Sequence, residues 1–184
     1  MAADIQRGAF YAVIFAMICM GIYILFRFRD ISFSVGTIAS IAVTVGAIIA
    51  SYSILWKFMP FSMEIDQTFV AAILAIIGYS MNDTIVVFDR IRETISHYPN
   101  RDRFQVINDA LNSTLSRTFN TSFSTLLVII VIFAFGGSSM RSFTFAIILG
   151  IIYGTYATLF VAAPIAYEIQ KRKIAKKKVL AEKK

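Results

Sequence analysis

The sequence TFVAAILAIIGYSMNDTIVVF, residues 68–88, decides the fold class of this chain. It is long enough to cross the hydrocarbon core of a bilayer as a helix, which takes about 20 predominantly apolar residues. Its one charged residue is Asp83. Because the apolar residues follow one another without alternating, the stretch predicts a membrane-spanning helix and not a strand of a membrane barrel.

Four further apolar stretches accompany this one, at about residues 9–28, 33–58, 117–137 and 143–167. The composition agrees, because 58% of the residues are hydrophobic and 16% are charged, against about 45–50% and about 25% in a typical soluble domain. The sequence therefore predicts an all-α fold, a polytopic membrane bundle of five transmembrane helices over residues 1–167.

The reactive side chains exclude several classes of protein. The single cysteine, Cys19, allows no internal disulfide and no Cys-based zinc site, and the single histidine, His97, allows no His cluster. The sequence also lacks a glycine-rich phosphate loop and the GxSxG and HExxH motifs. We therefore expect a protein that is not an enzyme and holds no metal or cofactor, and whose work draws on an ion gradient or a partner.

Basic residues are divided unequally between the two sides of the predicted membrane. Fifteen of the 18 Lys and Arg residues fall on one side, and the other side holds Arg7, Lys57 and Arg141. The positive-inside rule then places the N-terminus outside and the C-terminus in the cytoplasm. Since an external start this close to the first span is unusual for a complete protein, we expect a segment upstream of it.

Two segments are predicted to lie in the cytoplasm, a loop at residues 89–116 and a basic tail at residues 168–184. Apolar residues recur in the loop at helical spacing, namely Phe104, Ile107, Leu111 and Leu115. This pattern predicts an amphipathic helix on the membrane surface or, alternatively, a docking surface for a partner. We expect the tail to hold the topology near anionic lipid. No aromatic residue interleaves its lysines, so we do not expect it to bind nucleic acid.

Asp83 is the residue of the spans that points most clearly to a function. A carboxylate at this depth costs a few kcal/mol or more unless it is protonated or paired. Burial disfavours the charged form of the carboxyl group, and a nearby cation would favour it. A carboxyl group under these two opposing influences is suited to bind and release a proton. The structural alternative is an acid that reaches the interface or holds two helices together in a fixed ion pair.

The fourth span supplies a partner for this acid. Arg117, Thr121 and Thr125 are spaced by four residues and share one face of a helix. A guanidinium stays charged, so its burial would demand an anion, and Asp83 is the one acid deep within any span. We therefore predict an Asp83–Arg117 pair, although spacing alone does not establish contact. The hydroxyl groups of this span could also serve only to hold helices together.

Other polar and small residues complete the predicted site. The residues expected to bridge Asp83 and Arg117 through water are Ser80, Asn82, Thr84, Thr121 and Ser122. Gly150 and Gly154 form a GxxxG pattern, which predicts a face for close helix packing. Pro164 is expected to kink or end the last span.

Residues 77–93, IGYSMNDTIVVFDRIRE, closely resemble the hallmark of the SecF family of bacterial protein export. Further stretches resemble the same family, and the matches follow in order from about Arg7 to Tyr167, nearly the whole chain. They are Glu64–Ala71, Leu115–Thr118, Phe135–Gly137 with Arg141, and Gly150–Pro164. The third-span motif is specific to this family, and the ordered matches make a chance likeness a poor explanation.

The resemblance implies more than the residues do by themselves. SecF proteins have six spans with a large external domain after the first, so this chain would hold spans two to six. The fold would be half of a transporter of the resistance-nodulation-division (RND) superfamily. The implied function is to use protons as coupling ion, with SecD or the SecD half of a fused chain, to assist preprotein translocation across the bacterial inner membrane beside SecYEG.

Within this resemblance, Asp83 is the proton-linked acid and Arg117 the essential arginine of the family. Two alternatives remain open at this point. One is a purely structural subunit that stabilises the Sec translocon, in which Asp83 and Arg117 would form a fixed pair. The other is a fragment of a different RND-type, proton-driven permease.

Overall fold

The computed structural model describes the backbone of residues 2–182 and the side chains of residues 7, 8, 10–137, 140–176 and 180. All regular secondary structure in this part of the chain is helical, and it contains no strand. Its elements are α1 (Ala2–Phe28), α2 (Ile31–Leu55), α3 (Gln67–His97), α4 (Arg103–Phe135), α5 (Ser138–Ala157), the π-helical turn η1 (Thr158–Ala162) and α6 (Ala163–Glu182).

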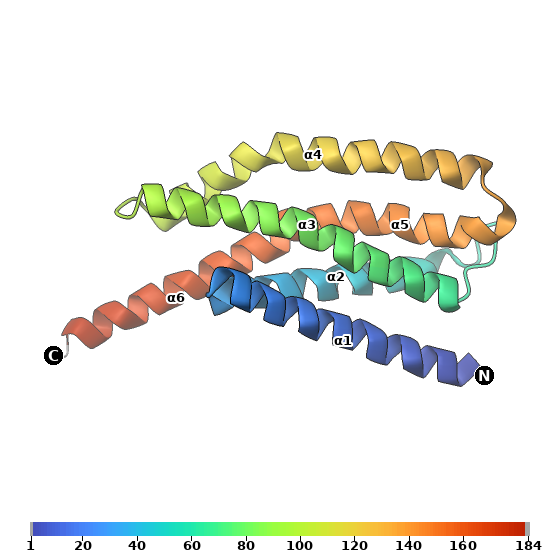
Figure 1. The fold of residues 1–184 in the computed structure, drawn as a ribbon, viewed down its shortest axis with the longest axis horizontal. Coiled ribbons are helices and arrows are strands. Elements are labelled where there is room, and N and C mark those ends of the chain that lie inside the picture. The colour runs from blue at the N-terminus through green and yellow to red at the C-terminus, as the bar shows by residue number, and fades with distance from the viewer. Residues whose placement is uncertain (1, 183–184) are drawn as a thin grey trace.

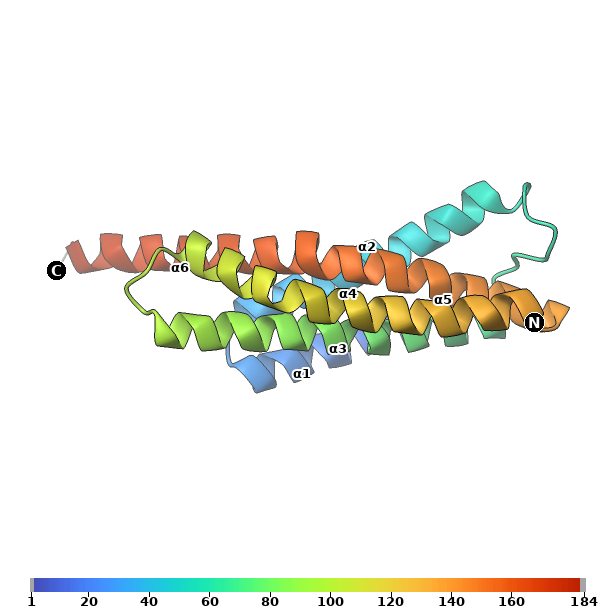
Figure 2. The ribbon, with the colours of Figure 1, turned by 90° about the horizontal axis from the view of Figure 1, so that it is seen from above.

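Five helical segments are long and apolar enough to cross a membrane, which confirms the predicted five-helix bundle. They are Phe10–Phe28, Ile31–Leu55, Gln67–His97, Arg103–Phe135 and Met140–Lys176, the last of which runs through α5, η1 and α6. The helices lie side by side, and the two ends of the chain lie at opposite ends of the bundle (Figures 1 and 2). Large apolar side chains such as Phe26 and Phe135 are exposed on its outside, as lipid contact requires.

The segment 89–116 does not form a separate helix, although most of it is helical. Instead α3 continues to His97 and α4 begins at Arg103, which leaves residues 98–102 as the connection (Figure 1). The Asp102 carboxylate caps α4 by accepting a hydrogen bond from the Gln105 N–H at 3.4 Å. Ile107 of the predicted apolar stripe is buried inside the protein. Phe104 and Leu115 of the same stripe are 60% and 41% exposed, so one part of the stripe packs inside the protein and another part stays on its surface.

The last span does not end at Pro164. Proline has no N–H for the bond to the residue four positions earlier, and the turn before it is a π-helix, Thr158–Ala162. At the end of this turn the Ala163 N–H bonds the Thr158 carbonyl, five residues back. The helix bends there, and α6 leaves the direction of α5 (Figure 1). The described part of the predicted tail, up to Glu182, is therefore a helix.

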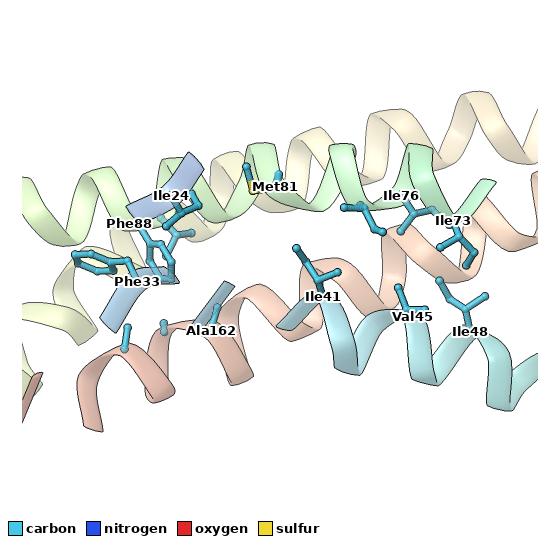
Figure 3. Packing of buried hydrophobic residues seen from close by; sticks show 14 of the residues in the cluster. Ile24, Phe33, Ile41, Val45, Ile48, Ile73, Ile76, Met81, Phe88 and Ala162 are labelled. Carbon is cyan, nitrogen blue, oxygen red and sulfur yellow. The ribbon is translucent and has the colours of Figure 1, made fainter. Parts of the chain in front are cut away.

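Most of the buried core side chains come from α2 and α3. Figure 3 shows two groups of buried side chains, in which Ile41, Val45 and Ile48 of α2 lie opposite Ile73 and Ile76 of α3. Nearer to the C-terminal end of the bundle, the rings of Phe33 and Phe88 pack with centroids 4.7 Å apart, beside Ile24 and Ala162. This packing fixes α3 at the centre of the bundle.

Small residues bring α5 and α3 close together. A Cβ atom on Gly150 would overlap the side chain of Ile76, and one on Gly154 would lie 3.1 Å from the Ser80 hydroxyl. The glycines at these two positions therefore set how closely α5 approaches the segment of α3 that carries Asp83.

Candidate functional site

The candidate site is a group of buried polar side chains around Asp83, near the middle of α3. This helix begins after Asp66, whose carboxylate accepts a hydrogen bond from the Phe69 N–H at 2.9 Å. Asp83 is 7% exposed. It is accompanied by buried hydroxyl side chains of three elements, namely Ser80 and Thr84 of α3, Thr118 and Ser122 of α4, and Thr158 of η1. Several helices thus direct polar groups into one buried region of an otherwise apolar bundle.

A chain of hydroxyl groups starts at the Asp83 carboxylate. The Ser122 hydroxyl donates to Asp83 Oδ2 at 3.5 Å and lies 2.7 Å from the Thr155 hydroxyl. The contact to Asp83 is long for a hydrogen bond, since O–H···O bonds are usually shorter than about 3.0 Å. The carboxylate is therefore held loosely, by a hydroxyl group that can either donate or accept a hydrogen bond.

The other buried hydroxyls differ in how well they are satisfied. Thr84 donates to the Ser80 carbonyl at 3.0 Å and lies 2.9 Å from the Thr158 hydroxyl. The hydroxyls of Ser80 and Thr118 are buried and have no hydrogen-bond partner among the described atoms. Because most buried polar groups in proteins are satisfied by protein or by ordered water, these two hydroxyls are places where a water molecule could bind.

Arg117 is not paired with Asp83 in this structure. The guanidinium is exposed, and of the ion pairs between described side chains none joins it to Asp83. This arginine lies five residues before Ser122, which contacts Asp83, so about 7.5 Å of helix rise separates Arg117 from the level of the carboxylate. Arg117 lines a polar cleft of about 360 Å³ between α3 and α4, together with Asp89 and Glu93. Those two acids already have partners, Arg27 at 3.0 Å and Arg90 at 2.9 Å.

The predicted supporting residues fall into two groups. Ser80, Thr84 and Ser122 are buried near Asp83, whereas Asn82 and Thr121 are exposed. The exposed pair lies on the seam between α3 and α4, because Tyr79 contacts Thr125 on one side of it and Val86 lies with Arg117 on the other. We call Asn82, Arg117, Thr121 and Thr125, with Tyr79, the outer seam.

Thr118, Thr155 and Thr158 belong to the site but are absent from the sequence prediction. A threonine within a span is more often a helix contact than a functional group, and spacing along one helix does not reveal a partner on another. The nearest signal for Thr155 is its place beside Gly154, at the closest approach of α5 to α3. No cluster of three His, Cys, Asp or Glu side chains that could hold a metal occurs in the described part of the chain.

Comparison with known proteins places the chain among protein-export proteins. The family model described as "Protein export membrane protein SecD/SecF, C-terminal" matches residues 1–172. The protein translocase subunit SecF of Rhodothermus marinus is 44% identical over 178 residues, which cover 97% of this chain and 58% of that protein. The protein translocase subunit SecDF of Brucella abortus is 41% identical over 168 residues, which cover 90% of this chain and 21% of that protein.

A solved structure has the same fold. The crystal structure of SecDF in its super-membrane-facing form superimposes with a TM-score of 0.84 at 36% identity, and covers 96% of this chain and 23% of that one. The chain therefore spans little more than half of the length of its SecF relative, and about a fifth of the fused protein.

Proposed function

The chain belongs to the SecD/SecF family of protein export membrane proteins, and from this premise we propose that it is the membrane part of a SecF-like subunit. In this proposal the subunit uses the proton-motive force, together with SecD, to assist preprotein translocation by SecYEG across the bacterial inner membrane. SecD would be a separate chain or the other half of a fused protein, as in the SecDF relative. The N-terminus would face the periplasm and the C-terminus the cytoplasm.

The burial of Asp83 is the observation that carries this proposal. Its carboxylate is 7% exposed and has one long hydrogen bond, from Ser122. A charged carboxylate in such surroundings is costly, and a proton removes the cost. Binding and loss of a proton would therefore change the attraction between Asp83 and the nearby charge of Arg117, and with it the balance of forces between α3 and α4.

The outer seam supports a contact with SecD. Arg117, Asn82 and Thr121 are exposed in helices that are long and apolar enough to span a membrane. Polar groups in spans almost always face a bundle interior or a water-filled cavity, because exposure to lipid is costly. We propose that SecD covers this seam and supplies further polar groups for the proton path.

The cleft at Arg117 supports a route for the proton to the cytoplasm. It is lined by polar and charged side chains of α3 and α4 and has a volume of about 360 Å³. A proton released from Asp83 would pass Arg117 and enter this cleft. The membrane potential supplies about 2.3 kcal/mol per charge for each 100 mV. This free energy is enough to shift the balance between two arrangements of α3 and α4, one with Asp83 protonated and one with Asp83 charged.

Export driven by a proton gradient tests the proposal. Membrane vesicles would carry the full-length protein with SecD, either as wild type or as Asp83→Asn. Asparagine has nearly the same shape and can still accept the Ser122 hydrogen bond, but it does not titrate. We expect Asp83→Asn to insert, to bind SecD and to lose the increment of export that depends on the gradient.

Asp109→Asn is the matched control, since it makes the same change on a side chain of α4 that is 48% exposed and lies outside the cleft at Arg117. We expect it to keep the proton-driven increment. If Asp83→Asn exports as the wild type does, Asp83 is architectural, and the structural-subunit alternative becomes the better account of the chain.

A further inference from the structure

A second cavity, of about 560 Å³, lies at the corner between α1 and α2, and none of the hydroxyl groups around Asp83 lines it. Its wall combines the aromatic rings of Phe28 and Phe33 with the side chains of Arg92, Arg103 and two lysines of α6, Lys173 and Lys176. Its size is that of sites which hold small ligands. Residues far apart in the sequence thus meet at the end of the bundle that the positive-inside rule assigns to the cytoplasm.

The cavity holds an excess of positive charge. Its one acid, Asp30, is already bound by Lys173 at 2.6 Å and by the Ser32 backbone N–H at 3.0 Å. Partial burial acts to raise the pKa of Asp30, but these bonds outweigh it and hold that pKa below its usual value. The carboxylate is therefore charged and fully engaged. No described carboxylate lies within ion-pair distance of Arg92, Arg103 or Lys176.

Arg103 is held in place without a partner for its charge. Its Nη1 atom is buried and has no hydrogen-bond partner among the described atoms. The neighbouring residue Phe104 packs edge-on against Tyr167 of α6, with ring centroids 5.9 Å apart, which fixes the start of α4 against α6. An arginine whose buried N–H groups lack an acceptor is prepared for an anion, and its planar fork matches phosphate oxygens in particular.

We propose that this cavity binds the phosphate headgroup of an anionic phospholipid of the cytoplasmic leaflet. Arg103 and Arg92 bind the phosphate oxygens, Lys176 adds charge, and an acyl chain follows the exposed apolar side chains of Ile174 and Leu180. Basic pockets between membrane helices at this level are suited to such headgroups. The site differs from a diffuse attraction of the tail to lipid because it demands these side chains in this geometry.

Native mass spectrometry of the full-length protein with SecD, titrated with phosphatidylglycerol or phosphatidylcholine, tests the proposal. We expect the wild type to retain phosphatidylglycerol. The triple variant Arg92→Gln, Arg103→Gln, Lys176→Gln should bind this lipid at least about tenfold more weakly. The matched control is Arg29→Gln, Lys171→Gln, Arg172→Gln, which removes the same charge from residues outside the cavity. We expect this control to bind as the wild type does.

Arg103→Lys separates a shaped site from charge alone, because it keeps the charge and removes the planar fork. It should weaken binding several-fold without disturbing the fold. The proposal is overturned if the two triple variants lose lipid equally, if Arg103→Lys binds as the wild type does, or if phosphatidylcholine binds equally well. It is also overturned if inorganic phosphate binds the cavity and phosphatidylglycerol does not, since the site would then serve a soluble anion.

Discussion

Asp30 is partly buried and Asp83 is almost fully buried, and the fold surrounds the two carboxylates with different groups. Asp30, at the corner of α1 and α2, has Lys173 at 2.6 Å and two hydrogen bonds from Ser32, at 3.0 and 2.9 Å. Asp83, in the middle of α3, has a single hydroxyl at 3.5 Å, and no described cation lies within ion-pair distance of it. One carboxylate is surrounded by groups that favour its charge, and the other is not.

This difference distinguishes a carboxyl group with a structural role from one with a functional role. The bonds of Asp30 cap α2 and tie it to α6, and they are strongest when the group stays charged. Ser122 can serve either protonation state of Asp83 by turning its hydroxyl. A group that must gain and lose a proton needs surroundings that tolerate both states, so weak bonding is the feature to test.

The largest effect on the fold should come from the packing that positions Asp83. Gly150→Ala places a methyl group against Ile76 and should lower the free energy of unfolding by about 1–3 kcal/mol, measured by unfolding in mixed detergent micelles. Gly78→Ala is the matched control, because a Cβ atom there meets nothing within 4 Å. It should be neutral or stabilising by about 0.5–1 kcal/mol. Equal losses would show that α5 does not set the position of α3.

Exchanging the two acids tests the comparison directly. Asp30→Ala removes a helix cap and should cost about 1–2 kcal/mol of stability, with the proton-driven increment of export retained in the molecules that fold. Asp83→Asn should leave stability unchanged or raise it, because it removes a buried charge that lacks a partner. Unfolding and export would be measured on both variants. A clear loss of stability in Asp83→Asn would show that Asp83 has a structural role as well.

A smaller effect is expected at the end of the hydroxyl chain. Thr155→Val keeps the shape of the side chain and removes the 2.7 Å contact to Ser122, at a cost of about 1 kcal/mol in stability. Export by the variant should depend less steeply on the proton gradient, because Ser122 loses the group that orients it. Thr155→Ser restores a hydroxyl and should restore that dependence. A valine variant with an unchanged dependence would exclude Thr155 from the proton path.

The smallest effect concerns the pH dependence of stability at Asp30. Its pKa lies below the usual value, because the hydrogen bonds from Lys173 and Ser32 outweigh partial burial. Its stabilisation is therefore complete above the unfolded pKa of about 4 and is lost as the pH falls through the lower, folded pKa. Since the pair is partly exposed, Lys173→Gln should cost less than about 1 kcal/mol at neutral pH. The difference from wild type should shrink under acid, as measured by unfolding across that range.

The sequence predicted the spans and the central acid because both rest on local properties. Hydropathy over a bilayer's thickness identifies a span wherever it lies, and Asp83 is the one acid deep within such a stretch. The ends of α3 and α4 were harder to predict. Charged residues such as Arg90 and Glu93 mark the edge of an apolar stretch, but a helix continues beyond it where side chains such as Ile107 find a place to pack.

What the sequence determined by itself was the five-helix membrane fold and the residue types within each span, since the length and hydropathy of a segment need no partner to be read. What only the tertiary structure decided was which face of α4 turns inward. Residues of one helix keep fixed angles to one another, so Arg117 and Thr121 share a face in any structure. The rotation of the helix about its axis depends on packing against its neighbours. Here the packing buries Thr118 and Ser122 beside Asp83 and leaves Arg117 exposed on the outer seam.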